Sequence, residues 1–69
     1  MGARPTLSEQ EKRILRMVLQ GKSIKQMSTI LDQHPNTITN RVRKARERMG
    51  LPSVDMRVVA EEARRLGLL

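Results

Sequence analysis

The chain has 69 residues, with 14 Lys and Arg against 7 Asp and Glu, and its net charge is +7 at pH 7. This length has room for one small domain, and the absence of cysteine excludes disulfides and cysteine-ligated zinc. A single histidine and the lack of a long apolar run argue against a histidine metal cage and a membrane anchor. We therefore expect a basic domain in the cytoplasm, attracted to a polyanion such as nucleic acid.

Hydrophobic residues make up 38% of the chain, and none of them is aromatic. A small aliphatic core leaves a thin margin of stability, because no single side chain buries a large area. We expect a dimer or another partner to supply part of the stability.

The first predicted helix follows a leader over residues 1–6. Ser8 and Glu11 have the spacing of a capping box, which predicts the start of a helix, and Gly21 predicts its end. Leu7 precedes the cap and can pack against the first turn. The apolar residues recur at helical spacing, at Ile14, Leu15, Val18 and Leu19.

Ser23 and Gln26 repeat the capping-box spacing and predict a second helix of about nine residues that ends near Asp32. Its expected apolar face consists of Ile24, Met27, Ile30 and Leu31. A turn follows, and Pro35 fits the first position of the next helix because its missing N–H costs nothing there. His34 is then the cap, although a weak one.

The third predicted helix runs over residues 35–49 and carries a charge of +4, from five cations and one Glu. One stripe of this helix is apolar and consists of Ile38, Val42, Ala45 and Met49. The remaining positions are polar or charged. Gly50 closes the helix.

A fourth helix is predicted to begin after a cap at Ser53 or Asp55 and to end near residue 66. Its inner stripe consists of Met56, Val59, Ala60, Ala63 and Leu66. A different face carries Val58, Glu62 and Arg65. Because no stretch alternates as a strand does, the predicted fold class is all-α with four helices.

A short helix, a tight turn and a longer basic helix form the pattern of a helix-turn-helix. A helix fits the major groove of DNA, where Arg pairs with guanine and Asn with adenine. We predict base contacts from the face opposite the apolar stripe of the third helix, at Thr39, Asn40 and Arg43. Phosphate contacts are predicted beside this face and at the start of the second helix, at Lys22, Ser23, Lys25, Arg41, Lys44 and Arg46. Arg48 lies on the same flanks of the third helix.

Other candidate residues have structural explanations. His34 has no second histidine, cysteine or carboxylate cluster beside it, and Ser8 and Ser23 have no base that would activate them. The methionines are interpreted as core residues. The sequence contains no paired carboxylates, glycine-rich phosphate loop or Ser/His/Asp set, so we expect no enzyme, no cofactor and no metal.

The order LSEQEKRILRMVLQGKSIKQMSTIL, then HPNTITNRVRKARERMGL and a last helix that ends in ARRLGLL resembles the LuxR-type helix-turn-helix domain over residues 7–69. This four-helix module is the DNA-binding part of quorum-sensing and response regulators, and it also occurs alone. The resemblance implies base contacts at Thr39, Asn40 and Arg43. It also implies a homodimer packed through the fourth helix, and we place Val58, Glu62 and Arg65 in its interface.

Several residues depart from the family's usual pattern. Thr39 stands where a Lys is usual, which weakens or retargets that base contact. Gln33 falls where an Ile is usually buried, and Ile24 replaces a polar residue. Asp32 replaces a glycine in the turn, and Arg13 replaces a Glu.

The sequence therefore predicts a stand-alone transcriptional regulator that binds duplex DNA as a homodimer, associated with the nucleoid. RNA polymerase or another regulator is a further candidate partner. The alternative from another class is a protein-binding anti-activator that pairs with a full-length LuxR-type regulator through the fourth helix and Ile24.

Two other interpretations have less support from the sequence. The stretch RVRKARERM also resembles region 4 of sigma factors, but the fourth helix after Pro52 argues against that family. Binding to an anionic membrane is disfavoured, because the sequence has no Trp or Phe to lie in the interface.

Overall fold

The computed structural model describes residues 5–69, and over this range it contains four α-helices and no strand. The helices are α1 (Glu9–Leu19), α2 (Ile24–Leu31), α3 (Pro35–Arg48) and α4 (Met56–Arg65). They confirm the predicted all-α class and the four predicted helices, with ends that differ from the expected ones by one or two residues. The first four residues of the predicted leader lie outside the described range.

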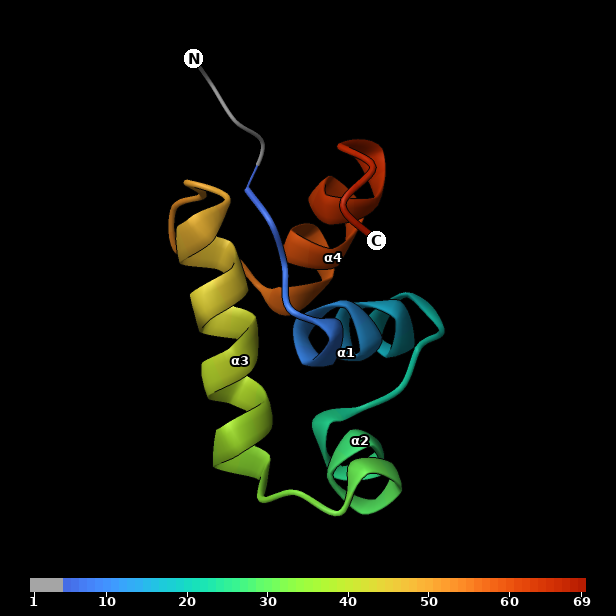
Figure 1. Cartoon of the computed structure of the whole chain (residues 1–69). Coiled ribbons are helices and arrows are strands. Elements are labelled where there is room, and N and C mark those ends of the chain that lie inside the picture. The colour runs from blue at the N-terminus through green and yellow to red at the C-terminus, as the bar shows by residue number, and fades with distance from the viewer. Residues whose placement is uncertain (1–4) are drawn as a thin grey trace.

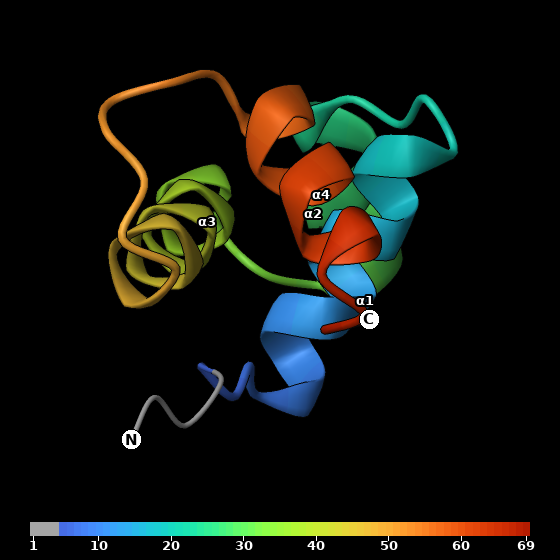
Figure 2. The ribbon, with the colours of Figure 1, turned by 90° about the horizontal axis from the view of Figure 1, so that it is seen from above.

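The helices are arranged so that α3 keeps a long side uncovered. α1 packs against both α4 and α3, while α2 packs against α3. Figure 1 shows α3 along one side of the molecule, with α4, α1 and α2 stacked beside it. α3 also contacts α4, and Figure 2 shows from above that the connector between these two helices loops outward.

The core is aliphatic and draws on all four helices. Its largest completely buried side chains are Ile14, Leu15, Met27, Ile38 and Val59. Three buried residues of α3 (Ile38, Val42 and Ala45) form the predicted inner stripe, and Met49 at its end is half-buried. Because so little of α3 is buried, most of this helix is available for contacts with another molecule.

The two predicted capping boxes are confirmed. The backbone N–H of Ser8 donates to Glu11 Oε1 at 2.8 Å, and the N–H of Glu11 donates to Ser8 Oγ at 3.1 Å. Ser23 and Gln26 repeat the arrangement at the same two distances at the start of α2. Each box satisfies two backbone donors that a helix start would otherwise leave unpaired.

The other predicted helix ends differ in the chemistry that caps them. His34 is the cap of α3, and its Nδ1 accepts a hydrogen bond from the N–H of Asn36 at 3.0 Å. Of the two candidates at the start of α4, Asp55 is the cap, accepting from the N–H of Val58 at 3.0 Å. Asp32 ends α2 with a left-handed backbone at φ 53°, a conformation that favours glycine.

One predicted core residue is wrong. Ile30 was expected on the apolar face of the second helix, but it is 52% exposed. α2 has only eight residues and, of the three other helices, packs mainly against α3, so its buried stripe is narrow. Met27 alone is completely buried there, and Ile24 and Leu31 are half-buried.

Gln33, in the turn before α3, is half-buried. Its Nε2 lies 3.5 Å from Gln10 Oε1, at the limit of a hydrogen bond. Its own Oε1 is buried and has no hydrogen-bond partner among residues 5–69. This position therefore carries the cost of a buried polar atom.

Candidate nucleic-acid interface

The three predicted base-contact residues lie together on the solvent side of α3. Thr39, Asn40 and Arg43 are exposed, while Ile38 and Val42 of the same helix are buried against the core. The helix thus presents a hydroxyl, an amide and a guanidinium along one ridge. These are groups that can hydrogen-bond to base edges in a major groove.

A polar hollow of about 340 Å³ borders this ridge on the side of α1. We call it the basic hollow; its lining residues are Ser8, Glu11, Thr37, Asn40, Arg41, Lys44 and Arg48. Three cations face one carboxylate there, which leaves a net charge of +2. The Nε of Arg41 is buried and has no hydrogen-bond partner within the described range. The hollow therefore offers a positively charged surface to an anion beside the ridge.

Glu11 at the edge of the basic hollow links α1 to the end of α3. Its carboxylate is buried, with 4% of the side chain exposed, and Oε1 accepts from Arg48 Nη1 at 2.6 Å. The same oxygen accepts from the N–H of Ser8 in the capping box. One buried carboxylate therefore fixes both the start of α1 and the side chain of Arg48.

Arg46 and Arg48, both expected on the flanks of the third helix, make different contacts in the structure. Arg46, a predicted phosphate contact, is half-buried, and its Nη1 donates to the carbonyl of Leu51 at 3.1 Å. Its guanidinium thus holds the connector after α3. Arg48, expected on the same flanks of the helix, has a side chain that is 48% exposed and lines the basic hollow. A sequence pattern could not separate them, because both belong to one run of charged residues.

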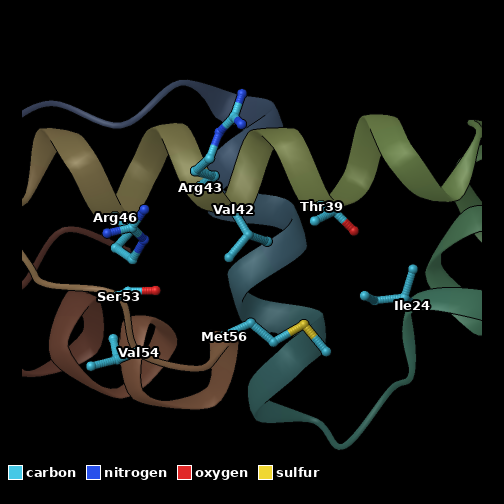
Figure 3. Close-up of a pocket in the computed structure, with 8 residues that line it drawn as sticks. All are labelled: Ile24, Thr39, Val42, Arg43, Arg46, Ser53, Val54 and Met56. Carbon is cyan, nitrogen blue, oxygen red and sulfur yellow. The ribbon is translucent and has the colours of Figure 1, made fainter.

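A second hollow, of about 410 Å³, lies on the other side of the ridge, toward α2 and α4. We call it the apolar hollow; it is lined by Ile24, Thr39, Val42, Arg43, Arg46, Ser53, Val54 and Met56 (Figure 3). In Figure 3 the guanidinium of Arg43 points away from the hollow, while Val42 and Met56 point into it. The ridge of α3 is therefore flanked by a charged surface and an apolar surface.

The remaining predicted phosphate contacts lie at the start of α2. Ser23 and Lys25 are exposed and Lys22 is half-buried. The capping box uses the N–H groups of Ser23 and Gln26. Within residues 5–69 the N–H groups of Ile24 and Lys25 have no such acceptor, so this terminus can donate to an anion.

The predicted dimer face of α4 points outward. Val58 is an exposed apolar residue, while Val59, Ala60 and Ala63 face the core. Glu62 and Arg65 form an ion pair on this face, with Arg65 Nη2 2.7 Å from Glu62 Oε1. The hydrogen bond from Arg65 lowers the pKa of Glu62, and the same hydrogen bond raises the pKa of Arg65.

Other site types have no counterpart in the part of the chain that the structure describes. Residues 5–69 contain no group of three or more His, Cys, Asp or Glu that could hold a metal ion. None of the four helices is both long and apolar enough to cross a membrane.

Comparison with protein families matches residues 5–60 to the family described as bacterial regulatory proteins, luxR family. The match covers most of the chain. The chain belongs to the LuxR family. Its helix-turn-helix is a DNA-binding regulatory domain rather than a catalytic one, which agrees with the expectation that this chain is no enzyme.

The family match covers α1, α2, α3 and the first half of α4. It therefore favours the LuxR-type interpretation over region 4 of sigma factors. The LuxR-like ending at residues 66–69, to which the predicted resemblance extended, lies outside the matched range. A search of curated proteins gives no significant match.

Proposed function

We propose that this LuxR-type domain is a sequence-specific transcriptional regulator of the cytoplasm that binds duplex DNA with α3 in the major groove. The observation that carries the proposal is the ridge of Thr39, Asn40 and Arg43 beside the basic hollow. The ridge supplies side chains that distinguish base pairs, whereas the hollow supplies charge that attracts any phosphate.

The phosphate contacts follow from the charges beside the ridge. A helix in the major groove lies between two phosphate backbones. Arg41, Lys44 and Arg48 approach one backbone from the basic hollow, and the start of α2 approaches the other with Lys22 and Lys25. Arg46 is not needed for this arrangement, because its guanidinium is engaged by the connector.

We also propose that the protein binds as a homodimer through the exposed face of α4. Val58 gives this face an apolar centre, and the ion pair of Glu62 and Arg65 gives it a polar edge. A dimer places two α3 helices on half-sites about one helical turn apart. Val58→Asp should then turn a dimer into a monomer in sedimentation, while Ile30→Asp on α2 should leave the dimer intact.

The test of DNA recognition begins with selection of bound duplexes from a random pool and continues with variants. Arg43→Ala should weaken binding to the selected site roughly 5- to 150-fold and relax the preference at one base pair, as expected for loss of an Arg–guanine pair. Arg16→Ala removes the same charge from an exposed position on α1 outside both hollows. It should change affinity less than twofold.

The phosphate contacts have a different signature. Lys44→Ala should weaken binding to all sequences alike and should reduce the slope of log K against log salt by about 1. If no sequence is enriched and Arg43→Ala leaves cellular regulation intact, DNA reading is refuted. A partner protein that binds through α4, as an anti-activator would, is then the function to pursue.

A further inference from the structure

We propose that Ile24 and Thr39 together form an apolar contact for the C5-methyl group of a thymine, so that thymine is required at one position of each half-site. This inference rests on the proposed function, because it assumes that α3 lies in the major groove. It adds a residue of α2, Ile24, to the surface that reads DNA.

The two residues lie on different helices but line the same end of the apolar hollow. Ile24 is half-buried at the first position of α2, and Thr39 is exposed on the ridge of α3. In Figure 3, Thr39 points down from α3 into the hollow and Ile24 extends toward it from α2. Met56 continues the apolar surface from the side of α4.

The position of Ile24 in the chain places it between the two kinds of DNA contact. Lys22 and Lys25, two residues before it and one after it, are the proposed phosphate contacts at the start of α2. Thr39, across the hollow, is a proposed base contact. A group bound between these contacts lies in the major groove at the edge of a base that is close to the phosphate backbone of the same strand.

The chemistry of the hollow selects which base edge fits there. An Ile side chain has no hydrogen-bond donor or acceptor, so it gains nothing from the N7, O6, N4 or N6 atoms of the other bases. The C5-methyl of thymine is the apolar group that an unmodified base pair presents in the major groove, and the methyl of a Thr is a common partner for it. Burial of that methyl in the hollow removes apolar surface from water.

Other occupants of the apolar hollow would give different experimental results. A hollow that stays filled with water in the complex would make the protein indifferent to the methyl group. A small amphipathic molecule bound there would compete with DNA instead of depending on a particular base.

The experiment uses the duplex recovered by selection, with each thymine of a half-site replaced in turn by deoxyuridine, which lacks only the methyl group. At one position this replacement should lower the affinity of the wild-type protein about fourfold, because one methyl group is no longer buried. At that same position, 5-methylcytosine should bind more tightly than cytosine by a similar factor.

Variants then test whether these two residues provide the contact. For Ile24→Ala and for Thr39→Ser, the ratio of the affinity for the thymine duplex to that for the deoxyuridine duplex should fall from about four toward one. Ile30→Ala shortens an exposed apolar residue of the same helix, outside the apolar hollow, and should keep the fourfold difference. Melting curves of the free proteins show whether each variant is folded, and a ratio of two affinities of the same variant does not depend on its active fraction.

The outcomes separate this inference from the proposed function. Selective binding with no deoxyuridine effect at any position, or a half-site without thymine, overturns the methyl contact and leaves DNA recognition standing. A deoxyuridine effect that survives in Ile24→Ala shows that Ile24 is not part of the contact and overturns the inference. A wild-type protein that selects no duplex overturns both.

Discussion

The ion pair of Glu11 and Arg48 gives a direct test of how α3 is held to α1. The pair joins residues 37 positions apart at 2.6 Å, and the carboxylate is buried while the guanidinium is half exposed. We expect a double-mutant cycle with Glu11→Gln and Arg48→Met to give a coupling free energy of about 1.5 kcal/mol. This lies between the values of exposed pairs and of fully buried ones.

The single variants should differ in a way that the geometry explains. Arg48→Met leaves a buried carboxylate with only the capping-box donor, which should lower the free energy of unfolding by about 2–3 kcal/mol. Glu11→Gln keeps an oxygen for that donor and releases an arginine that can reach water, so its cost should be about 2 kcal/mol. For a domain of this size, each kcal/mol corresponds to a shift of about 4–8 °C in Tm.

The assay is urea unfolding followed by far-UV circular dichroism, because the chain has no aromatic residue for intrinsic fluorescence. Protein concentration must be the same throughout, since a dimer would add to the apparent stability. The matched control is the cycle of Arg57 and Glu61, a pair at 3.5 Å whose side chains are 74% and 59% exposed. Its coupling should stay below about 0.5 kcal/mol. Equal couplings in the two cycles would refute the argument that burial of Glu11 strengthens its ion pair.

Three further predictions concern strain, burial and charge. Asp32→Gly should stabilise the domain by about 1 kcal/mol in urea unfolding, because it relieves a left-handed backbone and removes a negative charge from a helix C-terminus; Asp32→Asn should give less. Gln33→Met keeps the side-chain volume and removes a buried oxygen without a partner, so it should stabilise by about 1 kcal/mol; a loss of stability would show that this oxygen is satisfied. Arg65→Ala should raise the pKa of Glu62 toward its ordinary value in a carboxyl NMR titration, because the hydrogen bond that lowers it is lost. The stability from this pair should be present above the ordinary carboxyl pKa and lost as the pH falls through the lowered value.

The local features of the fold could be predicted because they depend on residues close together in the sequence. Ser8 with Glu11 and Ser23 with Gln26 each need only a three-residue spacing and a helix start. Asp55 was one of two candidates, and only the geometry of the connector decided between them. Ile30 was misplaced because a pattern reports amphipathicity but not how much of a short helix its neighbours cover.

The different surroundings of the two sides of α3 could not be predicted, because they depend on contacts between helices that are distant in the sequence. Arg46 and Arg48 belong to one charged run, and the sequence does not show which neighbour each will meet. The partner of Arg48 is the carboxylate of Glu11, 37 positions earlier in the chain, and that of Arg46 is a carbonyl in the connector. The apolar hollow likewise needs α2, α3 and α4 to be in place before its lining residues share a surface.

Because the two sides of α3 differ, we expect them to contribute differently to the affinity and to the selectivity of the proposed complex with DNA. A phosphate backbone lies on either side of a helix in the major groove, but α3 has free cationic groups toward only one of them, from Arg41 and Lys44 in the basic hollow. On the other side, Arg46 is held by the connector, so the start of α2 must supply the charge. The base edges nearest α2 then meet an apolar surface instead of cations. Cations that contact phosphates attract every sequence equally, whereas an apolar surface can distinguish thymine from other bases, so the side of α3 with less charge should add to the sequence preference of the ridge.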